Sequence, residues 1–423
     1  MDGAAYPLAA VALILTIVVR PSIGRDGFAW LDPALTTYIA LLALQLAPLS
    51  PQWRLGLSPA SRLVDLRLRL DASADAMADA ARALSVQPSR TMQSLALGAG
   101  VVLTFWCARS LFACGGIRAA ARTIAGLGLL LAAFGVAQHV TAPHTLYWMQ
   151  AFRSTEPYGP YLNRSDFAMW IVMALPLTAG YLLARLHSRQ HRGGELFSAD
   201  AFDDTAMFLT VTMGLMAAAL MVALSRSGLI AAAASALALW ILSQRRMHHA
   251  GRGWLLGGIG AMAIVALAFA NTSAVATRIG DTVNGNSAGR LAIWRATMPM
   301  IRDFWVTGVG AGAFERAMIV YQPAPHETYF NHAHNEYLQL AAEGGLWLMI
   351  PGALAVIAAI VCIGKRMSAD RTAIYWVRAG AASGMIAAAV QSMWETGLRR
   401  PANTLLFAIL AAVAMHASAG DRK

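Results

Sequence analysis

Long apolar runs recur from one end of this 423-residue chain to the other. Each run is long enough, or nearly so, to cross the roughly 30 Å hydrocarbon layer of a bilayer. In lipid a backbone satisfies its hydrogen bonds only as helix or closed barrel, and continuous rather than alternating runs favour helix. Only 13% of the residues are charged, whereas about a quarter are charged in soluble domains. The sequence therefore predicts an all-α, polytopic integral membrane protein with a single membrane domain over residues 1–423.

The apolar runs predict about eleven membrane spans. We expect them at residues 5–19, 34–49, 94–113, 119–139, 166–185, 205–224, 228–243, 254–271, 345–364, 373–393 and 402–419. Arginine clusters beside the spans orient the chain, because Lys and Arg concentrate in cytoplasmic loops. This orientation places a large loop at 272–344 and the turns at 225–227 and 394–401 on the opposite side. The extramembrane segment 50–93 falls there too, although it carries six arginines.

Charge and cysteine content exclude several classes of function. A formal net charge of +11 would indicate a nucleic-acid partner in a soluble protein. Here the arginines lie beside the spans and no basic face interleaved with aromatic residues appears, so we expect membrane lipid and no nucleic acid as partner. Cys107, Cys114 and Cys362 lie in or at the edges of predicted spans. Their odd number argues against a disulfide framework or a cysteine metal site.

The segment 50–93 contains an amphipathic pattern between residues 60 and 84. Apolar residues recur at spacings of three and four among Asp and Arg, at Leu63, Leu66, Leu70, Ala74, Met77, Ala81 and Leu84. This spacing predicts a helix that lies along the membrane surface. A solvated helix that only packs on the bundle would show the same pattern, so both interpretations stay open.

The large loop 272–344 contains a second helical stripe. The stripe consists of Leu291, Trp294, Met298, Ile301 and Trp305. Three glycines follow at 308, 310 and 312, where the backbone must turn or approach another segment closely. Arg290 lies one turn before Trp294, and it is either held against the bundle or extended from an apolar surface toward the polar interface.

The end of that loop is rich in histidine. Residues 326–345 include His332, His334 and Asn335. A histidine titrates near neutral pH, with an ordinary pKa of about 6.5, so one at a membrane face can deprotonate a hydroxyl group. His332 and His334 would also suit a metal ion, but no third ligand is obvious, and we expect no metal and no cofactor.

Further polar residues occur in other outer segments. They are Arg153, Asn163, Arg164, Ser165 and Asp166 before one span, Arg226 in a tight turn, and Arg399 and Arg400 before the last span. Asp166 or Ser165 would be explained by capping of the helix that begins there. Guanidinium groups bind phosphate oxygens in bidentate fashion and stay charged. Gathered around His334, the arginines would suit a lipid-linked diphosphate and stabilise its negative charge as it departs.

Five motifs follow one another between residues 150 and 402. They are NRSDFA at 163–168, LSRSG at 224–228, GRLAIW at 289–294 leading into GVGAGAF at 308–314, HAHNEYLQ at 332–339, and LRRPA at 398–402. Each motif alone is weak, but their order resembles that of the O-antigen ligase and O-antigen polymerase superfamily. The family spacing of His, then Asn, then nine residues, then Gly fits His334, Asn335 and Gly345.

The resemblance implies a membrane glycosyltransferase fold of the C type (GT-C), with about twelve spans, a large periplasmic loop and no metal. It implies inverting transfer of glycan from undecaprenyl diphosphate to a saccharide acceptor, either lipid A core or a growing polymer, at the periplasmic face of the bacterial inner membrane. His334 would be the catalytic base, with Arg226 and Arg290 binding the diphosphate. Arg153, Asn163, Arg164, His332, Asn335, Arg399 and Arg400 would be possible supporting residues. Ser165 stands where the family pattern has asparagine, so Asn163 receives no catalytic role.

Ligase and polymerase activity both fit this resemblance, with a slight preference for a polymerase from the first motif and the amphipathic segment. A transporter or flippase of lipid-linked saccharides is the alternative from another class, and a non-catalytic scaffold is a third. Transporters place ionisable residues at mid-bilayer on broken helices. Here the predicted spans are nearly free of charge and the polar residues lie in outer loops, which favours an enzyme.

Overall fold

The computed structural model describes most of the chain. The described residues are 4–24, 30–68, 81–143, 145–151, 157–190, 203–244, 246, 287–323 and 329–416. They form helices almost throughout, apart from two small antiparallel sheets. The prediction of an all-α membrane protein is confirmed. The expected span 254–271 and Arg153 lie outside the described residues, as does the middle of the amphipathic segment.

Six helices in the described ranges are long and apolar enough to cross a membrane, judged by length and composition. They are α5 (Pro88–Ala113), α6 (Ile117–Thr141), α7 (Arg164–Gln190), α8 (Asp204–Val222), α9 (Arg226–Ser243) and α14 (Glu336–Ala369). Three shorter apolar helices occupy other predicted spans, namely α1 (Ala5–Val19), α2 (Leu31–Leu44) and α16 (Pro401–Met415). The helix α15 (Ile374–Gln391) coincides with the predicted span 373–393. The chain is therefore a multi-pass membrane protein.

The chain divides into two compact units. The first unit contains Met1–Thr104 and Ile279–Val361, and the second contains Phe105–Arg278 and Cys362–Lys423. The helices α5 and α14 contribute residues to both units because the boundaries fall inside them.

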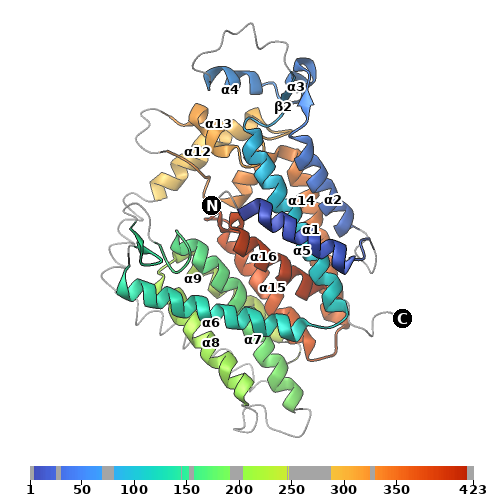
Figure 1. Cartoon of the computed structure of the whole chain (residues 1–423), viewed down its shortest axis with the longest axis vertical. Coiled ribbons are helices and arrows are strands. Elements are labelled where there is room, and N and C mark those ends of the chain that lie inside the picture. Colours follow the sequence, from blue (N-terminus) through green and yellow to red (C-terminus); the bar gives the residue numbers. More distant parts are fainter. Residues whose placement is uncertain are drawn as a thin grey trace. The chain divides into compact units, whose positions relative to one another are not determined.

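The second unit is built around α7 (Figure 1), and residues 165–181 of this helix are all buried. Close backbone approach to α15 depends on two glycines. A Cβ atom on Gly180 would lie 2.2 Å from the carbonyl oxygen of Trp376, and one on Gly380 would lie 2.3 Å from that of Pro176. Membrane helices commonly pack through such small residues, since lipid offers them no hydrophobic gain on association. The hairpin of β3 (Thr145–Leu146) and β4 (Gln150–Ala151) belongs to this unit.

The first unit carries a small core of short helices and strands in addition to its long apolar helices. The elements are β1 (Pro48–Leu49), α3 (Pro51–Leu57), α4 (Ser61–Arg67), β2 (Arg82–Ala83), α12 (Ser287–Asp303) and α13 (Phe314–Tyr321). The strand β1 pairs antiparallel with β2, and α4 packs against α13 (Figure 1). Val64, Phe304 and Phe314 are fully or almost fully buried in the core cluster that these elements share.

The predicted stripe on α12 is helical, but it is not the packed face. Leu291, Met298 and Trp305 are 43%, 52% and 59% exposed. Instead, Ile293 and Met300 are buried on the opposite side of the helix. The stripe therefore does not mark a single packed face, because α12 is apolar on two sides and periodicity alone cannot choose between two apolar faces.

The amphipathic prediction for residues 60–84 is wrong at its carboxyl end. The described helix α4 ends at Arg67, and Arg82 and Ala83 form a strand rather than a continued helix. Leu84 is buried beyond that strand, because pairing of β2 with β1 satisfies the backbone there in extended form. Leu63 and Leu66 are exposed on α4, so both contact with lipid and a solvated helix remain compatible with this face.

Candidate functional site

The glycine-rich loop after α12 is where distant segments of the first unit meet. Gly308, Gly310 and Gly312 all have positive φ angles, of 68°, 106° and 79°. A Cβ atom on Gly308 would lie 2.2 Å from the carbonyl carbon of Glu343, and one on Gly310 would lie 2.3 Å from Oγ of Ser85. Glycine is needed here for both its left-handed conformation and its lack of a side chain. The predicted close approach is confirmed.

A buried glutamine connects α2 to this loop. The Nε2 atom of Gln45 donates to the carbonyl oxygens of Thr307 and Glu343 at 2.8 and 3.0 Å, and its Oε1 accepts from the Ala311 amide at 3.0 Å. Gln45 is fully buried. A glutamine near the end of the predicted span 34–49 was the signal in the sequence for such contacts, because a buried amide must find partners. Sequence reasoning missed it.

Ala333, the residue between the two candidate histidines, is held by hydrogen bonds at both its amide and its carbonyl group. The Ala333 amide donates to Oε1 of Gln339 at 2.7 Å, and its carbonyl oxygen accepts from Nε1 of Trp294 at 2.9 Å. Ala333 is fully buried, whereas His332 and His334 are half-buried. We call this arrangement of Trp294, Ala333 and Gln339 the alanine clamp. It fixes the backbone from which both imidazoles project.

His334 itself adopts a left-handed backbone, with φ at 49°. For a residue other than glycine, such a conformation costs about 1–3 kcal/mol, and it persists only where the surroundings impose it. The next residue, Asn335, directly precedes α14, and its Oδ1 accepts from the amides of Tyr337 and Leu338 at 3.0 and 3.1 Å. The amide of Asn335 thus caps the helix, which explains the Asn that follows His334 in the motif.

A chain of polar side chains runs from His332 into the protein. Nε2 of Gln339 lies 3.4 Å from Nδ1 of His332 and donates to Oε1 of the buried Glu343 at 3.0 Å.

Gly345, two residues after Glu343, interrupts α14 with φ at 52°. A Cβ atom there would lie 2.6 Å from the carbonyl oxygen of Val306. The glycine of the motif is therefore required by the backbone rather than by chemistry.

Arg290 lies half-buried in the first turns of α12. Trp294 follows one turn later on the same helix and donates its indole hydrogen to Ala333. Thus the helix that carries Arg290 is tied directly to the segment that carries His334. Both predicted residues, with His332 and Asn335, belong to the first unit.

In the second unit the polar residues gather at the start of α7. Oδ1 of Asn163 accepts from the Ser165 amide at 2.9 Å, so Asn163 is the capping residue. The prediction that Asp166 or Ser165 caps this helix is wrong, because the carboxylate of Asp166 instead accepts from Nε of Arg400 at 2.6 Å. Asn is among the best residues for the cap position.

The turn between α8 and α9 approaches the same place. Oγ of Ser225 lies 3.3 Å from Oγ of Ser165 and accepts from the Gly228 amide at 3.3 Å. A Cβ atom on Gly228 would lie 2.7 Å from Cβ of Ala168, so glycine permits this packing. Arg226, the first residue of α9, is exposed within its unit.

The turn before α16 completes this cluster. Nδ2 of Asn403 donates to the carbonyl oxygens of Asp166 and Gly397 at 2.9 and 3.0 Å. Arg399 lies in the short helix η5 (Gly397–Arg399) and is half-buried, as are Arg164 and Arg400. The second unit therefore holds Asn163, Arg164, Arg226, Arg399 and Arg400.

Within the part of the chain that the structure describes, no three His, Cys, Asp or Glu side chains are grouped as a metal site would require.

Comparison with known proteins assigns a family to the middle of the chain. Residues 211–353 match the family model for O-antigen ligase. The resemblance to the O-antigen ligase and polymerase superfamily is confirmed. The matched stretch includes Arg226, Arg290 and the segment from His332 to Gly345. No curated protein matches the chain. The match supports a function of the O-antigen ligase or polymerase type in general, on a lipid-linked glycan and a saccharide acceptor.

Proposed function

We propose that this protein is an inverting glycosyltransferase at the periplasmic face of the bacterial inner membrane. It transfers glycan from undecaprenyl diphosphate to a sugar hydroxyl of the acceptor during synthesis of surface polysaccharide or lipopolysaccharide. The observation that carries this proposal is the alanine clamp beside the strained backbone of His334. Strained backbone that is held by its surroundings is typical of functional sites.

His334 is the proposed general base. The acceptor hydroxyl gives its proton to the imidazole as its oxygen bonds to the anomeric carbon of the donor sugar. The bond from that carbon to the diphosphate oxygen breaks, and the diphosphate leaves with the electron pair from the opposite face. Attack and departure on opposite faces invert the anomeric carbon. A positioned base contributes about 10²–10⁴-fold to such a step.

Arg226 and Arg290 are the proposed ligands of the departing diphosphate. Each guanidinium is permanently charged and presents two parallel donors to phosphate oxygens. Preorganised cations stabilise the charge that develops on the leaving group, so the proposed reaction needs no metal or cofactor. Arg164, Arg399 and Arg400 provide further positive charge in the second unit, where Asp166 pairs with Arg400.

A deletion strain tests the proposal. The wild-type gene should restore surface polysaccharide, whereas His334→Ala should not. His187→Ala is the matched control, because His187 lies in the last turn of α7 in the other unit. Accumulated undecaprenyl-linked polymer would identify a ligase, and accumulated single repeat units a polymerase. Normal polysaccharide from the His334→Ala variant, at equal amounts of protein in the membrane, would refute the proposal.

A further inference from the structure

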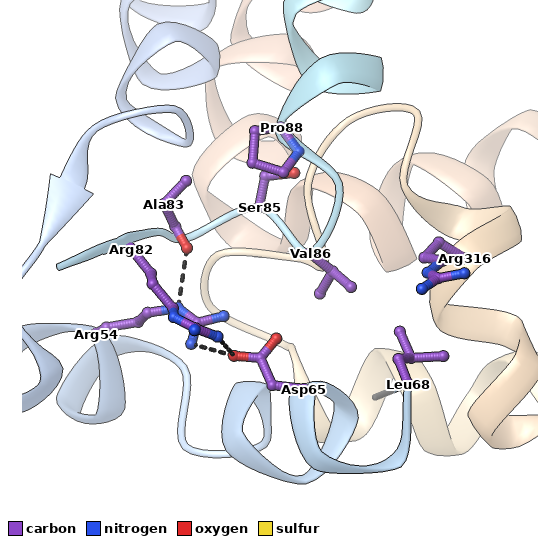
Figure 2. A pocket seen from close by; sticks show the side chains of 9 residues that line it. All are labelled: Arg54, Asp65, Leu68, Arg82, Ala83, Ser85, Val86, Pro88 and Arg316. Carbon is purple, nitrogen blue, oxygen red and sulfur yellow. Dashed lines mark hydrogen bonds and ion pairs between the residues drawn. The ribbon is translucent and has the colours of Figure 1, made fainter. Parts of the chain in front are cut away.

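The first unit contains a cavity of about 320 Å³ outside the candidate site. It lies between α4, the strand β2 with the connection to α5, and α13 (Figure 2). Its lining residues are Arg54, Asp65, Leu68, Arg82, Ala83, Ser85, Val86, Pro88 and Arg316. Small-molecule sites commonly have volumes of about 300–1,000 Å³, so the cavity has room for a small ligand or for one residue of a larger one.

One wall of the cavity is basic. Nη1 of Arg54 contacts Oδ2 of Asp65 at 2.6 Å, and its Nε donates to the carbonyl oxygen of Ala83 at 2.9 Å. The Arg54 side chain is only 9% exposed. Nη1 of Arg82 reaches the same carboxylate oxygen at 3.4 Å and is 26% exposed. One carboxylate thus faces two guanidinium groups, and Arg54 already uses its Nε and Nη1 donors on protein atoms.

Arg316 supplies a third guanidinium from α13, across the cavity from Arg82 (Figure 2). The Arg316 side chain is exposed and makes no hydrogen bond or ion pair with another residue of the described ranges. Three arginines and one aspartate therefore line the cavity. The balance of charge favours an anion there.

Hydrogen bonds hold the wall of the cavity formed by Ser85 and Val86 in place. Oγ of Ser85 accepts from the Gln87 amide at 3.1 Å and shares a hydrogen bond with Oγ1 of Thr91 at 2.7 Å. The Val86 amide donates to the carbonyl oxygen of Val309 at 2.9 Å. The strand that presents Arg82 is thereby fastened to the glycine-rich loop. A site held in place before binding loses less entropy when a ligand arrives.

A structural role accounts fully for Arg54 and in part for Arg82, which also reaches Asp65, but not for Arg316. The contacts of Arg54 with Asp65 and Ala83 hold α3, α4 and β2 together without help from Arg316. Arginines are also unusual on the side of the membrane to which we assign this segment, since positive residues concentrate in cytoplasmic loops. Leu68, Val86 and Pro88 make the remaining walls apolar, so the ligand has an anionic end and a less polar body.

We propose that this cavity binds the carboxylate or phosphate group of an acidic sugar in the acceptor glycan. The inference rests on the proposed function, which makes a saccharide the acceptor. Arg82 and Arg316 bind the two sides of the oxyanion, and the apolar wall packs against the carbon face of the sugar ring. The acceptor would thus be selected by charge at a place separate from His334.

Binding to the full-length protein purified in detergent tests this proposal, by calorimetry with glucuronate, glucose and inorganic phosphate as probes. Glucuronate should bind more tightly than either other probe. Arg82→Gln and Arg316→Gln should each weaken glucuronate binding at least about tenfold, which corresponds to about 1.4 kcal/mol. Arg302→Gln is the matched control, because Arg302 is 83% exposed on α12 and does not line the cavity.

Three results would overturn the proposal. Equal binding of glucose and glucuronate would show that the charge of the carboxylate does not contribute to binding. Equal binding of phosphate and glucuronate would show an anion site without a sugar. Equal loss in Arg302→Gln would show a general effect of net charge. The same titration on His334→Ala separates the two proposals, since that variant should keep glucuronate binding while it loses glycan transfer. If His334→Ala still made polysaccharide, only the proposed function would fail.

Discussion

The two polar clusters hold their side chains in different ways. In the first unit, the segment around His334 is fixed by side chains that reach backbone atoms of distant segments, as Trp294 and Gln339 do at Ala333. In the second unit, the arginine-bearing turns are fixed by helix caps at Asn163 and Ser225, by the ion pair of Arg400 with Asp166, and by the side chain of Asn403, which donates to the carbonyl oxygens of Asp166 and Gly397. The first arrangement fixes the backbone beside the proposed base, His334, whereas the second gathers guanidinium groups, which suits the proposed binding of a diphosphate.

Substitution of the arginines should have the largest effect on kcat, and it tests whether both units contribute to diphosphate binding. Arg290→Gln in the first unit and Arg226→Gln in the second should each lower kcat about 10²–10³-fold, the usual loss on removing one donor to a developing charge. A transfer assay on purified protein measures this. Arg302→Gln and Arg118→Gln remove the same charge elsewhere and should change kcat less than twofold. Equal kcat values in all four variants would show that neither cluster binds the diphosphate.

Gly308→Ala should destabilise the first unit by about 2–4 kcal/mol, because the new Cβ combines overpacking with a strained backbone. The measurement is thermal unfolding in detergent, followed with Gly126→Ala as control. Gly126 lies on α6 with nothing within 4 Å of its Cβ position, so alanine there should leave stability unchanged or raise it slightly. A Gly308→Ala variant as stable as Gly126→Ala would show that the glycine-rich loop does not fasten the His334 segment.

Loss of one clamp hydrogen bond should have a moderate effect. Trp294→Phe leaves the buried carbonyl oxygen of Ala333 without its indole donor, at a cost of about 1–3 kcal/mol. It should lower kcat about tenfold and leave KM unchanged, because Trp294 positions His334 without touching substrate. Trp305→Phe alters an exposed indole just beyond α12 and should be neutral. An altered KM with unchanged kcat would contradict the positioning role.

The smallest effect is expected in the second unit at the cap of α7. Asn163→Ala should cost about 0.5–2 kcal/mol of stability, the usual loss for a cap residue, and Asn163→Asp should restore most of it. Thermal unfolding of the three proteins measures this. A large loss of activity in Asn163→Asp, with stability intact, would mean that the amide acts on substrate, and the contrast between the clusters would weaken.

Much of the fold could be predicted because each membrane span appears in the sequence as a continuous run of apolar residues. The glycines at 308, 310 and 312 were predicted as points of close approach, and the structure gives each a positive φ. The orientation of α12 could not be predicted, since both of its sides are apolar. Which residue caps α7 was also missed, because Asn163, Ser165 and Asp166 all suit that role by type.

The candidate site was predicted in its residues but not in its supports. His334, Asn335 and Gly345 were predicted because their spacing resembles that of the family motif. Gln45 lies far from them along the chain and appears only as a single polar residue at the end of an apolar run. Hydrogen bonds such as those from Gln45 to Thr307 and Glu343 depend on tertiary contacts that no local pattern encodes.

Glycan transfer by the purified protein tests the role of His334 most directly. Wild-type protein, a lipid diphosphate donor and a saccharide acceptor are mixed, and the rate is compared with that of His334→Ala at equal donor binding. We expect the variant to lose at least about 100-fold in kcat, as general bases contribute, with donor binding unchanged. Transfer by His334→Ala at the wild-type rate would contradict the assignment of this imidazole as the base.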